Sequence, residues 1–172
     1  ATIPKAFNLL APNAQIDIVD INSALVPIVD KYFDFRTDRK NKIIVEDGAK
    51  FVKNVPEDTY DIVLIDVFGT NYIPPVFLTN EFMQDVKKII TKDGIIGFNT
   101  FVDTKHKELE AKLFKDNFGA YYSLEYNNKI MYMDFSYVKT SLSYYLSYYR
   151  SELNLISDID CIYLDRIGIG CM

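Results

Sequence analysis

The sequence CIYLDRIGIGCM (residues 161–172) decides the expected fold when it is read together with ATIPKAFNLLAPNAQIDIVDIN (1–22). The first stretch has the pattern of a buried strand that runs into a glycine turn, Gly168-x-Gly170. The second has the pattern of the helix and the strand that follow such a turn. Joined tail to head, they give strand, glycine turn, helix, strand and an acidic residue, which is the opening of a nucleotide-binding βαβ unit.

The join predicts that the chain is either a circular permutant or written in an order other than its biological one. In a doubly wound sheet the first strand lies in the middle, between the second and the fourth. If residues 15–21 form strand two and 60–67 form strand four, the N-terminal part supplies no strand one. If no strand lay between strands two and four, their facing backbone amides and carbonyls would be buried without hydrogen-bond partners. We therefore expect the segment at about 159–168 to supply strand one.

The rest of the chain alternates strand and helix patterns, which is typical of an α/β sheet. The apolar run YDIVLIDV (60–67) predicts a strand buried on both faces. Thr79 stands at the cap position of an amphipathic helix, KDG at 92–94 indicates the turn that ends it, and Asn-Asn at 127–128 indicates a hairpin turn. Further strands are expected at 15–21, 42–47, 95–101, 121–126 and 129–135, and helices at 23–33, 49–54, 79–91, 104–117 and 138–153. The sequence thus predicts one α/β domain over residues 1–172, with a seven-stranded, mostly parallel sheet.

Composition and charge narrow the classes of function. The net charge of −5 argues against a nucleic-acid-binding surface. No stretch approaches the roughly 18 uncharged apolar residues of a membrane span, and no signal-peptide pattern is visible. The two cysteines, Cys161 and Cys171, are too few for a disulfide framework and lack metal-ligand spacing. We therefore expect a cytoplasmic protein with no nucleic-acid partner, no membrane and no bound metal.

Three aspartates follow three successive predicted strands, at the strand ends where open α/β sheets place their sites. Asp20 lies about twenty residues past the glycine turn, counted through the join, where an acidic residue accepts hydrogen bonds from ribose hydroxyls. Its alternative is a helix-capping or solvated aspartate. Asp47, before Gly48, is suited to the adenine edge, or is a plain turn aspartate. Asp66 ends the most apolar strand and is the candidate general base, although a strand-end aspartate can equally be structural.

The stretches QIDIVDIN, VEDGAKFV and YDIVLIDVFGTNYIPPVFLTNEFMQDVKKIITKDGIIGFNTF resemble the polyamine aminopropyltransferases, that is, the spermidine and spermine synthases. The resemblance covers residues 1–101 and, through the join, 134–172. The string FGTNYIPPVFLTNEF is similar to a divergent, spermidine-synthase-like branch. The resemblance implies a Rossmann-like three-layer sandwich of the S-adenosylmethionine-dependent methyltransferase type, and a homodimer.

The resemblance also implies a co-substrate and the residues that bind it. The co-substrate is decarboxylated S-adenosylmethionine, whose aminopropyl group goes to a polyamine acceptor such as putrescine, with release of methylthioadenosine. The binding positions fall on Asp20 for the ribose, Asp47 and Gly48 for the adenine, and Gly168 and Gly170 in the turn.

Asp66 takes the family's position for the general base that deprotonates the attacking amine. Tyr72 is a candidate for lining the acceptor pocket, with a packed loop tyrosine as its alternative. The sequence departs from the family at two positions: Gly69 stands where a second aspartate follows the base, and Cys171 stands where an aspartate follows the glycines. Both departures remove negative charge from places where ammonium groups bind.

Three functions remain open at this point. The first is an aminopropyltransferase with Asp66 as base. The second is an S-adenosylmethionine-dependent methyltransferase on the same fold. The third is a non-catalytic binding or assembly protein that keeps the fold, which the missing carboxylates and the tyrosines at helical spacing in 138–153 favour.

Overall fold

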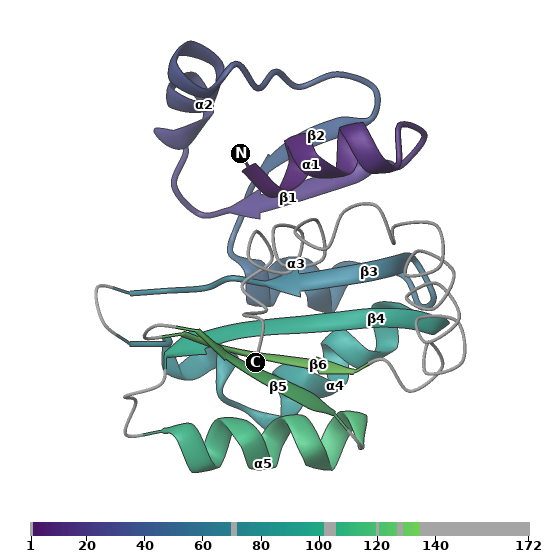
Figure 1. Cartoon of the computed structure of the whole chain (residues 1–172), viewed down its shortest axis with the longest axis vertical. Helices are drawn as coiled ribbons and strands as arrows, with labels where there is room; N and C mark the ends of the chain where they lie inside the picture. Colours follow the sequence, from purple (N-terminus) through teal and green to yellow (C-terminus); the bar gives the residue numbers. More distant parts are fainter. Residues whose placement is uncertain (1, 70–71, 102–105, 120, 127–128, 135–172) are drawn as a thin grey trace, which may run out of the picture. The chain divides into compact units, whose positions relative to one another are not determined.

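The computed structural model describes residues 2–69, 72–101, 106–119, 121–126 and 129–134. These residues form two compact units, the first ending at Asn54 and the second beginning at Val55 (Figure 1). Several predictions lie outside the described residues. They are the helix expected at 138–153, the strand expected at about 159–168 and the two residues of the tail-to-head join, 172 and 1.

The first unit is a two-stranded parallel sheet with three helices. Its strands pair from Ile16 with Asn41 to Asp20 with Val45. Pro27 lies in the first turn of its second helix, where a missing backbone N–H is tolerated. Its elements are α1 (Thr2–Leu10), β1 (Ile16–Asp20), α2 (Leu25–Phe33), β2 (Asn41–Val45) and α3 (Gly48–Asn54).

The second unit is a four-stranded mixed sheet in the order β3-β4-β6-β5. The pair β3–β4 is parallel, whereas β4–β6 and β5–β6 are antiparallel. The predicted hairpin is confirmed, because β5 and β6 pair up to Tyr126 opposite Lys129. The elements are β3 (Tyr60–Ile65), the 3-10 helix η1 (Pro75–Phe77), α4 (Asn80–Ile89), β4 (Ile90–Phe101), α5 (Lys107–Phe118), β5 (Tyr122–Tyr126) and β6 (Lys129–Asp134).

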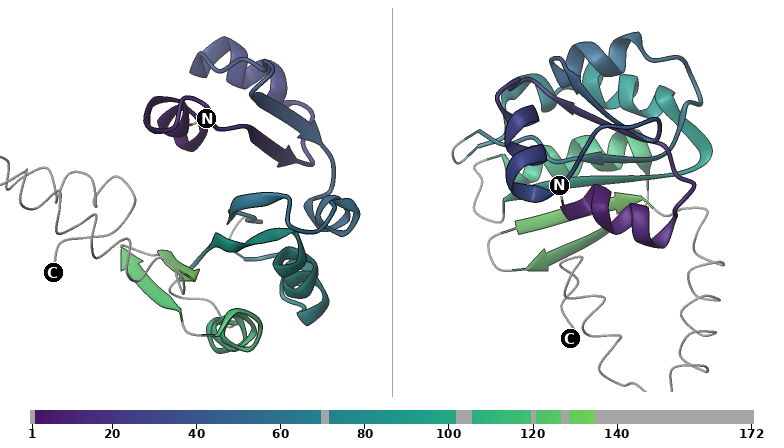
Figure 2. Two further views of the ribbon diagram at one scale, coloured as in Figure 1. Left: turned by 90° about the vertical axis from the view of Figure 1, so that its right-hand side faces the viewer. Right: turned by 90° about the horizontal axis from the view of Figure 1, so that it is seen from above.

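The helices α4 and α5 pack together against this second sheet, as the views of Figure 2 show. The predicted cap is confirmed: the Thr79 hydroxyl accepts a hydrogen bond from the backbone N–H of Phe82 at 3.1 Å. Helix α5 packs through Phe114, whose ring lies 5.8 Å from that of Tyr132 on β6. Phe98 on β4 is fully buried, so the core of this unit lies between the helices and the two inner strands.

Strand β4 begins earlier than the sequence predicts. The expected turn at 92–94 lies within β4, as a bulge. Tyr60 pairs with Ile90 but Ile62 pairs with Ile95, so two residues along β3 are matched by five along β4. A Cβ at Gly94 would collide with Cγ2 of Ile90 and lie 3.0 Å from the carbonyl oxygens of Asp61 and Thr91, so a larger residue would crowd the bulge.

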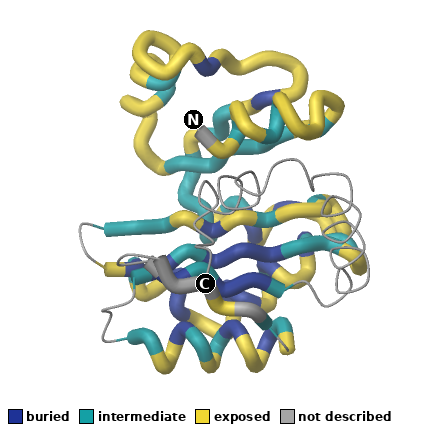
Figure 3. The backbone as a smooth tube through the Cα atoms, in the orientation of Figure 1, coloured by how far each residue is buried: buried dark blue, intermediate teal, exposed yellow. Residues whose placement is uncertain are grey.

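The expected double-sided burial of the run 60–67 is wrong for the described structure. Among the described residues, strand β3 is an edge strand of its sheet. Ile65 is buried, but Ile62 and Leu64 on the other face are 41% and 43% exposed. Along β3, exposed and less exposed stretches follow one another in the tube of Figure 3. The described residues contain six strands in two sheets, and the seventh predicted strand, at about 159–168, lies outside them.

Candidate functional site

Asp20 and Asp47 lie at the same edge of the first unit's sheet. Asp20 is the last residue of β1 and pairs with Val45, the last residue of β2. The ladder extends one step further, because the backbone N–H of Glu46 donates to the carbonyl oxygen of Asp20 at 3.1 Å. Since the two strands are parallel, this is the carboxyl edge, where α/β sheets place ligands.

The Asp20 carboxylate shapes the loop that leaves β1. Its Oδ1 accepts a hydrogen bond from the backbone N–H of Asn22 at 2.7 Å. The side chain of Asn22 in turn accepts one from Ala24 at 3.0 Å. These two turns hold the chain between β1 and α2 and leave Asp20 half-buried at the sheet edge.

The Asp47 carboxylate caps helix α3. Its Oδ1 accepts hydrogen bonds from the backbone N–H groups of Ala49, at 2.9 Å, and Lys50, at 3.1 Å. This is the turn-type role that the sequence left open as an alternative. Gly48 follows as the first residue of α3. Only one of the two carboxylate oxygens is used in these bonds, so the other can still meet a ligand.

Asp66 follows the last residue of β3 directly, at the carboxyl edge of the second unit's sheet. It is exposed, and its Oδ1 accepts a hydrogen bond from Nδ2 of Asn99 at 2.8 Å. Asn99 is half-buried on the neighbouring strand β4. A carboxylate held in this way at a strand end is suited to take a proton from a bound molecule.

Gly69, three residues beyond Asp66, lies in contact with Tyr72. The backbone N–H of Gly69 donates to the carbonyl oxygen of Tyr72 at 2.8 Å. A Cβ at Gly69 would lie 2.5 Å from Cε1 and 2.7 Å from Cζ of the Tyr72 ring. The half-exposed ring therefore covers the place where any other residue at 69 would put its side chain.

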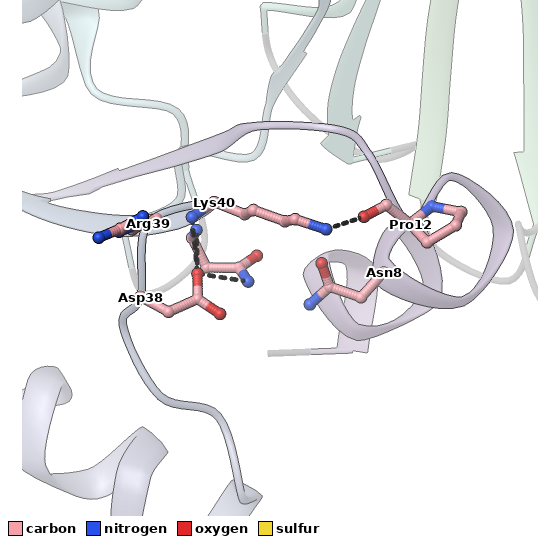
Figure 4. Close-up of a pocket in the computed structure, with 6 residues that line it drawn as sticks. Asn8, Pro12, Asp38, Arg39 and Lys40 are labelled. Atoms are coloured by element: carbon pink, nitrogen blue, oxygen red, sulfur yellow. Dashed lines mark hydrogen bonds between the residues drawn. The ribbon is translucent and has the colours of Figure 1, made fainter.

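A cavity of about 510 Å³ lies elsewhere in the first unit (Figure 4). Lys40 Nζ donates to the carbonyl oxygen of Pro12. Asp38 Oδ1 accepts from the backbone N–H of Lys40 at 2.7 Å. Both segments precede their strands, so the cavity lies at the amino edge of the parallel pair, opposite Asp20 and Asp47. Its lining residues are Asn8, Pro12, Asp38, Arg39, Lys40 and Asn41.

The predicted site residues thus fall into three groups. Asp20, Asp47 and Gly48 lie at one sheet edge in the first unit, and Asp66 and Tyr72 lie in the second. Gly168 and Gly170 lie outside the described residues. Within the described ranges, no group of three or more His, Cys, Asp or Glu side chains is arranged to hold a metal ion. Among those same residues, no helix is long and apolar enough to cross a membrane.

Asn99 is the site residue that sequence reasoning missed. It lies in the apolar run IIGFNTF, where it reads as one polar residue in a central strand. The position of Asn99 in the sequence could have identified it. Because β4 follows β3 and pairs with it in parallel, a polar side chain near the end of β4 lies next to the end of β3. Only the register, with Ile65 opposite Phe98, identifies Asn99 as the neighbour of Asp66.

The sequence is similar to known polyamine enzymes. The profile of the spermine/spermidine synthase domain matches residues 8–152. A polyamine aminopropyltransferase of Vibrio vulnificus (strain CMCP6) is 28% identical over 126 residues, which are 72% of this chain and 42% of the relative. The chain therefore spans less than half the length of that curated relative.

Solved structures share the fold. A probable spermidine synthase from Corynebacterium glutamicum ATCC 13032 superimposes with a TM-score of 0.71 at 18% identity, covering 78% of this chain and 52% of that one. Human methyltransferase-like protein 13, in complex with SAH, gives 0.66 at 23% identity, covering 76% and 65%. The described residues therefore have an α/β fold of the S-adenosylmethionine-dependent methyltransferase type. With most of its length matched by the family profile, the chain belongs to the spermine/spermidine synthase domain family.

Proposed function

We propose that this chain is the catalytic part of a polyamine aminopropyltransferase. The observation that carries the proposal is the match to the spermine/spermidine synthase domain. The Asp66 carboxylate, which accepts a hydrogen bond from Asn99 at the carboxyl end of β3, supplies a candidate base for the reaction. The similarity to the Vibrio vulnificus aminopropyltransferase supports the same activity. The proposed co-substrate is decarboxylated S-adenosylmethionine, and the proposed acceptor is a polyamine such as putrescine.

The proposed reaction is a direct displacement. The acceptor nitrogen attacks the aminopropyl carbon next to the sulfonium; a C–N bond forms and the C–S bond breaks. The bonding pair returns to sulfur, which leaves as the neutral thioether methylthioadenosine and needs no acid. The proton lost from the acceptor nitrogen passes to the Asp66 carboxylate and then to solvent. The protein has to orient the two substrates and remove this proton.

The carboxylates of the first unit have a proposed role in binding the donor. Asp20 would accept hydrogen bonds from the ribose hydroxyls. Asp47 would use the oxygen that is not engaged with Ala49 and Lys50 to meet the adenine edge. Gly168 and Gly170 would form the turn beside the donor, and Tyr72 would line the acceptor pocket. A homodimer in the cytoplasm belongs to the same proposal.

A methyltransferase is the second candidate. It is favoured by the fold similarity to methyltransferase-like protein 13, whose structure contains SAH. The two activities differ in the donor, because a methyltransferase uses the carboxylated form. A third candidate is a non-catalytic protein. It is favoured because Gly69 and Cys171 stand at positions where the family has carboxylates.

Calorimetric titration separates these candidates. The 172-residue chain would be titrated in parallel with decarboxylated S-adenosylmethionine, S-adenosylmethionine and methylthioadenosine. Aminopropyl transfer predicts tight binding of the decarboxylated donor and of methylthioadenosine. Preference for the carboxylated donor would replace the proposal with a methyltransferase, and binding of none of the three would favour a protein without catalytic activity.

A further inference from the structure

The ends of β3 and β4 are joined by two side-chain contacts. The first is the 2.8 Å hydrogen bond from Asn99 Nδ2 to Asp66 Oδ1. The second lies two residues further along the chain from Asp66 and from Asn99, where the ring centroids of Phe68 and Phe101 are 4.7 Å apart. Together they fix the segment that leaves β3 against a longer strand, so the Asp66 backbone has a defined place at the sheet edge.

The face on which Asn99 lies distinguishes it from its neighbours on β4. Phe98 and Thr100 are fully buried, and Thr100 donates to Glu110 on α5 at 2.6 Å, so they face the helices. Side chains alternate along a strand, so Asn99 points to the opposite face. Leu64 lies on that face too, because its Cδ2 would be 2.9 Å from a Cβ at Gly97. Asp66 and Asn99 therefore meet on the face of β3 and β4 away from α4 and α5.

The Asn99 carboxamide has no other role in the fold that the structure displays. It caps no helix and closes no turn. Within the described part of the chain, the bond to Asp66 is the one hydrogen bond of either side chain. Burying an amide in an apolar strand costs free energy unless the amide is hydrogen-bonded. Here Nδ2 of the half-buried Asn99 donates its hydrogen bond to the exposed carboxylate of Asp66.

We propose that Asn99 is a positioning residue for Asp66, an inference that rests on the aminopropyltransferase function proposed above. An exposed aspartate turns freely about its side-chain torsions, whereas a donor on one oxygen selects a single orientation. With Oδ1 held by Asn99, Oδ2 is the oxygen that receives the proton of the acceptor amine. Asn99 acts through Asp66 and not on the substrates.

The test is a double-mutant cycle on kcat in the 172-residue chain. Asn99→Leu removes the donor at similar volume. We expect kcat to fall about 10- to 100-fold, as for a misplaced catalytic group, with the KM of the donor changed less than about twofold. In an Asp66→Asn background the same substitution should change kcat less than about twofold, since residues that act as one unit are not additive.

The matched control uses the other side-chain bond between these strands. Thr91 Oγ1 donates to Asp61 Oδ1 at 3.1 Å, at the opposite end of β3. Thr91→Val removes this bond and should leave kcat unchanged. An Asn99→Leu loss that is fully retained in the Asp66→Asn background, or one matched by Thr91→Val, would overturn the positioning role.

The failure of the proposed function would be distinguishable from the failure of this inference. If the unsubstituted chain releases no methylthioadenosine, the aminopropyltransferase function is wrong, and the base role that Asn99 supports falls with it. The bond itself is read separately from the side-chain amide signals of Asn99 in ¹⁵N-labelled protein, which should shift in Asp66→Asn. Unshifted signals in an active enzyme would reject the inference alone.

Discussion

Asp38 shows at the scale of one residue how backbone amides stabilise a carboxylate. Its Oδ1 accepts hydrogen bonds from the backbone N–H groups of Asn41 and Lys40, both at 2.7 Å. The bond from Asn41 first, and then that from Lys40, lowers the pKa of Asp38 below its ordinary 3.8. A depressed pKa means that the folded state is favoured above the unfolded value and loses this contribution as the pH falls through the folded one.

Asp38→Asn is therefore expected to lower the thermal unfolding midpoint at pH 7, with a deficit that shrinks as the pH falls through 3.8 and disappears below the folded-state pKa. Thermal melts followed by circular dichroism from pH 7 to about pH 2 measure it. Asp30→Asn is the control, because it breaks only an exposed ion pair with Arg36 and should have little effect at any pH. A deficit that is the same at every pH would contradict the account.

Gly69 and Tyr72 give a second prediction at this scale. A methyl group at 69 would collide with the Tyr72 ring, so Gly69→Ala should displace it. If Tyr72 lines the acceptor pocket, the KM of putrescine rises and the KM of the donor does not. In a Tyr72→Ala background, Gly69→Ala should add nothing, because there is no ring to displace. Independent, additive effects in steady-state kinetics would show that the loop does not act this way.

Helix α4 provides a prediction at the scale of one element. Its first turn is capped by Thr79, whose hydroxyl accepts from Phe82 and donates to the carbonyl oxygen of Val76 at 3.1 Å. Thr79→Ala leaves the N–H without this partner and should lower the free energy of unfolding by about 1 kcal/mol. Urea denaturation measures the loss. Thr79→Ser keeps the hydroxyl and should recover most of it; an equal loss in both variants would assign the effect to the methyl group.

Elements with strong local signals were predictable from the sequence, and their partners were not. The cap at Thr79 and the hairpin around 127–128 depend on neighbours in sequence, so local pattern found them. The residues KDG at 92–94 also favour a turn by their local sequence. They form a bulge within β4 instead, because β4 pairs with β3 on both sides of them. Pairing between distant segments overrides a local preference.

The candidate site divides in the same way. Asp20, Asp47 and Asp66 were predicted because a carboxylate at a strand end is visible in the sequence. The Asp47 carboxylate bonds the turn that opens α3, which is close to the turn aspartate that was its stated alternative. The link from Asp66 to Asn99 depends on a strand register over 33 residues of sequence, which no local pattern contains.

At the scale of the whole molecule, the two units differ in how much they bury. In residues 2–54 the buried apolar side chains are Phe35 and Val52, whereas β4, β6, α4 and α5 enclose a continuous core. A chain this short with so small a core is not expected to fold alone. A peptide of residues 1–54 should therefore give no cooperative melt by circular dichroism. A sigmoidal transition in that peptide would show that the first unit is independently stable.

We also propose that residues 159–168 supply a strand that pairs with β3, which is an edge strand of the sheet that the described residues form. A proline inside a paired strand removes a ladder hydrogen bond. Tyr163→Pro should therefore speed amide hydrogen exchange in β3 more than in β4. Met172→Ala, beyond the proposed strand, is the control and should leave both unchanged. Equal exchange in β3 with and without the proline would reject this strand assignment.

The release of methylthioadenosine tests the central claim most directly. The 172-residue chain would be incubated with decarboxylated S-adenosylmethionine and putrescine, and both products would be quantified by chromatography. Aminopropyl transfer predicts equal amounts of methylthioadenosine and aminopropylated acceptor, and a rate at least about 100-fold lower in Asp66→Asn with donor binding retained. No methylthioadenosine from the unsubstituted chain, or an undiminished rate in Asp66→Asn, would contradict the account.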